Sequence, residues 1–185
     1  HEVSSLALDP LPRSLYSLAN LKTDLNYDLR GDVRSLKETE GAFRKVQPDF
    51  VVHLAAQALV REGFKEPYQT YETNVLGTLN VLEASARSNT VRAQLLVTSD
   101  KVYAPMNKPR PYVESDPLGG DDPYSASKAM ADILAQEWLT SGRTKPGAVV
   151  RAGNVIGAGD TSPDRLFPDI VRALETGADV KIRYP

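Results

Sequence analysis

The sequence contains no cysteine, and His1 and His53 are its two histidines among 185 residues. Without cysteine, disulfides and thiolate metal sites are excluded within these residues. With so few histidines, we expect no catalytic metal site. A cysteine-free chain is typical of cytoplasmic proteins, and we expect that location.

Long apolar runs and blocks of like charge are also lacking. No run approaches the roughly 20 residues that a membrane-spanning helix needs, so we expect no membrane partner. The formal net charge is −2, which argues against a nucleic-acid partner bound by phosphate neutralisation. The hydrophobic content of 41% and the charged content of 25% are those of an ordinary globular domain with a buried core.

The chain also has no Gly-x-Gly-x-x-Gly motif, although its strands and helices alternate. Apolar periodicity predicts strands at 2–8, 27–30, 50–54, 94–98, 148–151 and 180–183, and helices at 14–21, 35–46, 67–88, 124–139 and 166–176. This alternation predicts an α/β, doubly wound parallel sheet of the Rossmann-like class, covered by helices on both faces. In that class a glycine-rich turn follows the first strand. We therefore expect the first strand to precede His1 and the fold to be incomplete at both ends.

Tyr124 and Lys128 stand four residues apart at the start of a predicted helix, so they share one face. A cation beside a phenol favours the phenolate, which can take a proton from a hydroxyl group. The spacing alone is a weak signal, and an exposed helix pair is the alternative.

Ser99, Asp100 and Lys101 follow the predicted strand at 94–98. Ligands bind at the carboxyl ends of strands in open α/β sheets, so we expect this triplet in a site. Ser99 could hold a reacting oxygen, Asp100 could act as an acid, and Lys101 adds a second basic group.

Longer stretches extend this pattern over nearly the whole chain: 53–57 (HLAAQ), 74–83 (NVLGTLNVLE), 98–103 (TSDKVY), 116–128 (DPLGGDDPYSASK), 151–157 (RAGNVIG) and 164–170 (DRLFPDI). At these residues the chain resembles the extended short-chain dehydrogenases/reductases. Within them it is most similar to the nucleotide-sugar 4,6-dehydratases, and Lys101 and the Leu-Gly-Gly-x-Asp-Pro-Tyr run point to their CDP-glucose branch.

The resemblance implies an NAD-dependent lyase that converts CDP-glucose to CDP-4-keto-6-deoxyglucose. It implies that Tyr124 is the base for the 4-hydroxyl, that Lys128 tunes Tyr124 and binds the cofactor ribose, and that Ser99 binds the same hydroxyl. Asp100 is the implied acid for the departing 6-hydroxyl. Lys101 takes the position that handles the C5 proton, either as a base or as an electrostatic stabiliser.

The resemblance also assigns binding residues. The implied cofactor contacts, besides Tyr124 and Lys128, are Asp32, Val33, Leu54, Ala55, Ala56 and Thr98, and the implied substrate contacts are Ser99, Asn154 and Arg165. Asp32 could instead be a turn or cap residue, and Arg165 a solvated charge at a helix start. Asn74 resembles a structural asparagine, and we expect His53 to be a core histidine. NADP is not excluded by the residues present.

Residues 1–185 are expected to form a partial NAD-binding Rossmann domain, with 153–185 beginning the substrate-binding part. The family resemblance implies a nucleotide-sugar partner and a homodimer of the full-length protein. Three alternatives stay open: a nucleotide-sugar 4-epimerase, a dTDP- or GDP-sugar 4,6-dehydratase, and a non-catalytic dinucleotide-binding protein of the same fold.

Overall fold

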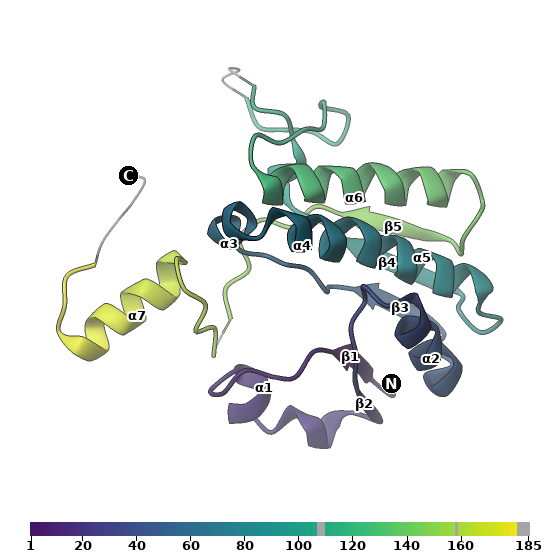
Figure 1. Cartoon of the computed structure of the whole chain (residues 1–185), viewed down its shortest axis with the longest axis horizontal. Coiled ribbons are helices and arrows are strands. Elements are labelled where there is room, and N and C mark those ends of the chain that lie inside the picture. Colours follow the sequence, from purple (N-terminus) through teal and green to yellow (C-terminus); the bar gives the residue numbers. More distant parts are fainter. Residues whose placement is uncertain (107–109, 158, 181–185) are drawn as a thin grey trace.

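The computed structural model of the chain describes residues 1–106, 110–157 and 159–180. Its strands form two parallel sheets (Figure 1). One pairs β1 (Ser4–Ala7) with β2 (Tyr27–Arg30), and the other has the order β3-β4-β5. Within the described ranges no strand pairing joins the two sheets.

The larger sheet contains β3 (Phe50–His53), β4 (Ala93–Val97) and β5 (Gly147–Val150). Its register sets Val52 beside Leu95 and Leu95 beside Ala148. The connection from β3 to β4 ends in α5 (Gly77–Arg87), and the connection from β4 to β5 contains α6 (Pro123–Thr140). Both helices lie over the same face of the sheet (Figure 1). Successive right-handed crossovers in one direction put their helices on one side of a sheet, which explains this arrangement.

The opposite face of this sheet is open in the described structure. Phe50 is 65% exposed and Val52 is 57% exposed, and Val150 on β5 is also exposed. The parallel sheets and their helices agree with the predicted Rossmann-like α/β class. The prediction that 50–54 is a buried strand is wrong for the described residues, because one face of β3 is exposed there. Apolar composition indicates a strand that can be buried, but the direction of the crossovers decides which face receives a helix.

The hydrophobic core lies between this sheet and its two helices. Leu82 from α5, Leu96 from β4 and Ala135 from α6 form its buried centre. Leu134, Trp138, Leu139 and Val149 pack around that centre. The core thus fixes α6 against β4, the two elements that carry the predicted catalytic residues.

The smaller sheet carries the first helical segments, α1 (Leu15–Leu18) and a 3₁₀ turn, η1 (Leu21–Asp24). After β2, α2 (Leu36–Val46) begins at Ser35, whose hydroxyl accepts a hydrogen bond from the Glu38 N–H. α2 packs on α5. The amide of Asn80 on α5 donates to the carbonyls of Val33 and Arg34, which joins the end of β2 to the larger sheet.

The predicted long helix at 67–88 is one helical run with a π-helical turn inside it. It consists of α4 (Pro67–Tyr71), the π turn η2 (Glu72–Leu76) and α5. A short preceding helix, α3 (Val60–Lys65), was not predicted. It is too short to show helical periodicity, and its contacts with α4 and α6 stabilise it.

The remaining elements are a 3₁₀ turn after β4, η3 (Asp100–Val102), and α7 (Leu166–Thr176), which lies apart from the sheets (Figure 1). The predicted strand at 180–183 lies, apart from Val180, outside the described residues. None of the helices in the described part of the chain is long and apolar enough to cross a membrane.

Leu82→Ala should destabilise the protein by about 2–5 kcal/mol, because it leaves a cavity between α5, β4 and α6. Leu174→Ala is the control, because Leu174 is 76% exposed on α7 and its truncation should cost less than about 0.5 kcal/mol. Urea unfolding followed by circular dichroism measures both. Equal losses in the two variants would contradict this placement of the core.

Candidate functional site

A cavity of about 1560 Å³ opens at the carboxyl ends of β3, β4 and β5. Its walls come from the loop after β3, the residues after β4, the start of α6, residues 152–157 and 159–161, and α7. The ends of the parallel strands meet here, as they do at the ligand sites of open α/β sheets. Ten of the residues that the sequence assigned to a site line it: Leu54, Ala56, Thr98, Ser99, Asp100, Lys101, Tyr124, Lys128, Asn154 and Arg165.

Tyr124 is the second residue of α6. The helix begins at Asp122, whose carboxylate accepts a hydrogen bond of 2.9 Å from the Ser125 N–H, and Pro123 occupies the first helical position. A Cβ atom added to Gly120 would lie 2.4 Å from the backbone nitrogen of Ala126. The loop before α6 therefore packs directly on the first helical turn, where a side chain at position 120 would displace it.

Lys128 lies one turn further along α6 and is buried. Its Nζ donates a hydrogen bond of 3.0 Å to the carbonyl of Val97, the last residue of β4. Burial lowers the pKa of Lys128 to about 8, and the carboxylate of Asp132 opposes that shift. The ammonium thus ties α6 to the strand end that precedes Ser99.

The triplet Ser99-Asp100-Lys101 turns sharply after β4. The Ser99 hydroxyl accepts a hydrogen bond from the Lys101 N–H at 3.2 Å and lies 3.3 Å from Asp100 Oδ1, to which it donates. The Asp100 N–H donates to the carbonyl of Ala152. Val102 is fully buried and anchors the turn. Asp100 and Lys101 are left exposed at the cavity wall.

A hydrogen-bond network joins the loop after β3 to α6. The side chain of Asn74, in the π turn, donates to the carbonyl of Gln57 and to the hydroxyl of Ser127, and it accepts from the Gln57 N–H. Ser127 in turn donates to the carbonyl of Tyr124. Asn74 therefore has the structural role that its resemblance implied. Gln57 and Ser127 were not predicted as part of this network, because the order of residues in a motif does not show which side chains contact each other in the fold.

His53 is a core histidine, as predicted. It is buried, and its Nε2 lies 3.0 Å from the Thr78 hydroxyl. Burial lowers the pKa of His53 to about 4, and the charge of Lys128 adds to that shift. The imidazole is therefore neutral beside the buried ammonium.

Asp32, Val33 and Ala55 do not line the cavity. Asp32 accepts hydrogen bonds from the backbone and the guanidinium of Arg34, which hold the pKa of its carboxyl below the usual value against the effect of burial. Val33 is buried beside Gly77. The structure thus gives Asp32 the turn role that the sequence left open, and a cofactor contact for these three residues stays a prediction.

Arg165 stands at the start of α7 without a side-chain bond to the helix, and it lines the cavity near Asp160, whose carboxyl pKa its charge helps to lower. Two further arginines, Arg13 and Arg61, line the cavity and were not predicted. Arg61 forms an ion pair with Asp164 at 3.1 Å. No sequence signal places the loop after β1 at this cavity, because that contact depends on how the two sheets are arranged.

Among the residues that the structure describes, no group of three or more histidine, aspartate or glutamate side chains is arranged to hold a metal ion.

The fold and the site define a Rossmann-like α/β protein with a Tyr-Lys pair facing a Ser-Asp-Lys triplet. The pattern of the NAD dependent epimerase/dehydratase family matches residues 7–184. The chain therefore belongs to this family.

Individual relatives agree with this membership. The chain is 39% identical over 192 residues to the CDP-glucose 4,6-dehydratase of Salmonella typhimurium, covering 99% of this chain and 53% of that protein. It is 34% identical to the dTDP-glucose 4,6-dehydratase of Haemophilus influenzae, covering 58% of this chain and 34% of that protein. The chain thus spans about half or less of the length of these relatives.

A solved structure shows the same fold. The dTDP-glucose 4,6-dehydratase of Streptomyces venezuelae, determined as a double mutant with NAD bound, superposes with a TM-score of 0.81 at 28% identity. The superposition covers 95% of this chain and 53% of that one. The two parallel sheets described above therefore correspond to part of a larger dehydratase fold.

Proposed function

We propose that the intact protein containing this chain is a nucleotide-sugar 4,6-dehydratase that converts CDP-glucose to CDP-4-keto-6-deoxyglucose with NAD. The observation that carries the proposal is that one cavity is lined by both Tyr124-Lys128 and Ser99-Asp100-Lys101. The first pair suits oxidation of a hydroxyl, and the triplet supplies groups for an elimination. The similarity to the Salmonella typhimurium enzyme favours the CDP-glucose substrate.

The residues present fit a dinucleotide and a sugar nucleotide together. The cavity volume of about 1560 Å³ exceeds the roughly 300–1,000 Å³ of a typical single-ligand pocket. Leu54, Ala56, Thr98 and Lys128 line the cavity, which supports their proposed cofactor contacts, with Lys128 as the proposed ribose-binding group. Asn154 and Arg165 line the same cavity, and an arginine suits a diphosphate as a bidentate donor.

Tyr124 accepts the proton of the sugar 4-hydroxyl, which Ser99 holds by a hydrogen bond. Bound NAD would supply a hydride acceptor for oxidation of C4 and the same hydride for reduction of C6. The C4 ketone makes the C5 proton acidic. That proton leaves to a base of the site, and Asp100 protonates the departing 6-hydroxyl, which is released as water. A proton then returns to C5 as C6 is reduced, which completes the 4-keto-6-deoxy product. Each step needs one positioned proton donor or acceptor.

Lys101 faces the C5 proton in this scheme. Its amine acts either as the base that removes this proton or as a cation that stabilises the enolate. Both roles require it on the cavity wall, where it lies.

In the domain organisation that we propose, residues 1–185 form part of the NAD-binding domain, and 153–185 begin the substrate-binding part. The position of Asn154 and Arg165 on the cavity wall supports this division.

We further propose a homodimer and a cytoplasmic location. Exposed apolar side chains on neighbouring helices support the dimer: Tyr68 on α4, Leu76 in the π turn, and Met130 and Ile133 on α6. The cytoplasmic location rests on the cysteine-free sequence.

A nucleotide-sugar 4-epimerase is the nearest rival within the family, because it shares the need for the Tyr-Lys pair. Epimerisation leaves the 6-hydroxyl of the sugar in place, so it gives Asp100 no leaving group to protonate. Incubation of the intact enzyme with CDP-glucose and NAD separates the two, since a dehydratase yields a product lighter by one water and an epimerase yields an isomer.

Tyr124→Phe should lower turnover of the intact enzyme by about 10²–10⁴-fold, because the variant lacks the general base, while KM changes little. Tyr27→Phe is the matched control, because Tyr27 is 37% exposed on β2 and lies outside the cavity. Steady-state kinetics with CDP-glucose measure both. Near-parental turnover of Tyr124→Phe would exclude Tyr124 as the base.

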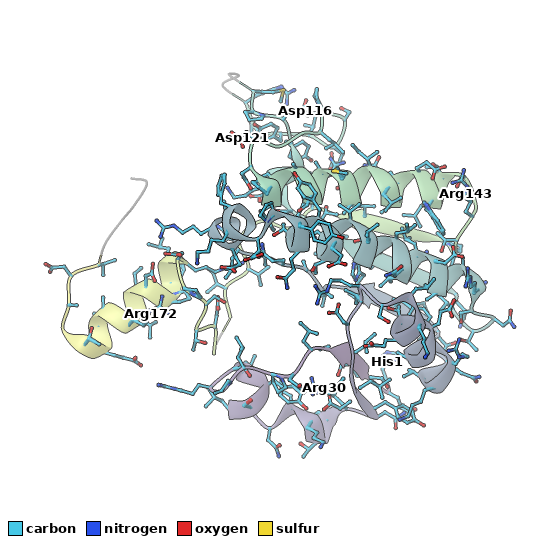
Figure 2. The ribbon with its side chains drawn as sticks, viewed as in Figure 1. His1, Arg30, Asp116, Asp121, Arg143 and Arg172 are labelled. Atoms are coloured by element: carbon cyan, nitrogen blue, oxygen red, sulfur yellow. The ribbon has the colours of Figure 1, made fainter. Side chains whose placement is uncertain are left out.

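Asp100→Asn should stop the reaction after oxidation of C4, because Tyr124 remains but the 6-hydroxyl has lost its acid. Reduced cofactor then accumulates, and stopped-flow absorbance follows it. Asp121→Asn is the control, since Asp121 is an exposed loop acid outside the cavity (Figure 2). If Asp100→Asn forms product at the parental rate without accumulating reduced cofactor, another group is the acid.

A further inference from the structure

Asp132 is a fully buried carboxylate one helical turn after Lys128 on α6. Its Oδ2 accepts hydrogen bonds from the Thr98 hydroxyl at 2.8 Å and from Arg151 Nε at 2.9 Å. Its Oδ1 accepts from Arg151 Nη2 at 3.0 Å and from Gln136 Nε2 at 2.5 Å. The reaction proposed above assigns no task to this carboxylate.

Arg151, the residue after β5, connects the carboxylate to the loop that follows the triplet. Besides the two bonds to Asp132, its Nη1 donates to the Tyr103 hydroxyl at 3.0 Å and to the Glu114 carbonyl at 2.9 Å. The guanidinium also lies 4.8 Å from the centre of the Tyr103 ring. The pair therefore touches α6, the end of β4, the end of β5 and the exit of η3.

The contacts of this pair all lead to residues adjacent to the site. Thr98 immediately precedes Ser99, and Tyr103 follows the buried Val102 that anchors the turn. Ala152, next to Arg151, accepts the N–H of Asp100. A buried ion pair is weak evidence for stability in itself, because desolvation cancels much of its attraction. The contacts of the ion pair next to Ser99 and Asp100 indicate that it positions these residues rather than stabilising the fold.

We propose that Asp132 and Arg151 are positioning residues that hold the Ser99-Lys101 triplet in register with Tyr124 and Lys128 and set the electrostatic balance at the Lys128 ammonium. The kinetic part of this proposal rests on the dehydratase function. The electrostatic part does not, because it concerns the chain's own groups.

Asp132 and Arg151 carry opposite charges, and we expect them to shift the pKa of Lys128 in opposite directions. The Asp132 carboxylate favours the ammonium and raises the pKa of Lys128 against the larger effect of burial. Burial would raise the pKa of the Asp132 carboxyl, but the hydrogen bonds from Arg151, Thr98 and Gln136 keep it below its usual value, so the carboxylate is charged.

Other charged or titratable groups near Lys128 come from each element around it. They are His53 on β3, and Tyr124, Asp100 and Lys101, which line the same cavity as Lys128. Arg151 after β5 reaches this group through its bonds to Asp132. Asp132→Asn removes a negative charge, so Lys128 should lose its proton at a lower pH. Arg151→Gln removes a positive charge, so Lys128 should keep its proton to a higher pH.

The test is an NMR titration of the Lys128 side chain in the intact protein labelled with ¹³C-lysine, with the signal assigned by Lys128→Arg. The parental midpoint should lie at about 8, below the roughly 10.4 of an ordinary lysine. We expect the midpoint to fall in Asp132→Asn and to rise in Arg151→Gln. The control is Glu137→Gln, which breaks an exposed ion pair with Arg143 at the far end of the same helix and should leave the midpoint unchanged (Figure 2).

Kinetics with CDP-glucose supply the second readout. Both variants should lower kcat by about 10–100-fold through displacement of the triplet, with KM altered only a few-fold. If the midpoints shift in opposite directions but the parental enzyme does not dehydrate CDP-glucose, the electrostatic part is supported and the proposed function is wrong. The proposal is overturned if the Lys128 midpoint shifts in the same direction in both variants or does not shift. It is also overturned if kcat is unchanged in the variants while the parental enzyme is active.

Arg151→Lys extends the test if the charge-removing variants do not fold. It keeps the positive charge but loses the bidentate bond to Asp132. The Lys128 midpoint should then stay near its parental value while kcat falls. Parental kcat in this variant would overturn the proposal.

Discussion

The candidate site depends on one interaction of the buried Lys128 ammonium. Its hydrogen bond to the Val97 carbonyl fastens α6 to the end of β4. Tyr124 precedes it by one helical turn, and Ser99 follows Val97 by two residues. A single contact between two elements thus brings the two halves of the candidate site to one cavity. The core beneath it, formed by Leu82, Leu96 and Ala135, keeps the same two elements packed.

Such a charge needs compensation because burial disfavours it. The carbonyl of Val97 and the carboxylate of Asp132 provide that compensation, and His53 stays neutral beside it. Arg151 then neutralises Asp132 and extends the network to Tyr103. Lys128, Asp132 and Arg151 therefore form one network of compensating charges. Substitution of one of them should alter the protonation or the position of the others.

Much of this arrangement could be predicted from the sequence. The bounds predicted for β2 and α7 agree with the structure, and the Tyr-Lys and Ser-Asp-Lys residues line one cavity, because strand ends and helix periodicity are local signals. The exposed sheet face at Phe50 and the cavity arginine Arg13 could not be predicted, because both depend on how the elements pack. The sequence left two roles open for Asp32, a cofactor contact or a turn residue. The structure pairs it with Arg34 outside the cavity, which agrees with the turn role, and the cofactor contact stays a prediction.

In the proposed reaction, one site oxidises C4 of the sugar, eliminates water across C5 and C6, and returns the same hydride to C6. The direct measurement uses CDP-glucose that carries deuterium at C4 and the intact enzyme. We expect a 4-keto-6-deoxy product with the deuterium at C6 of the same molecule, measured by NMR and mass spectrometry. Deuterium retained at C4 of an isomerised sugar, or lost to solvent, would contradict it.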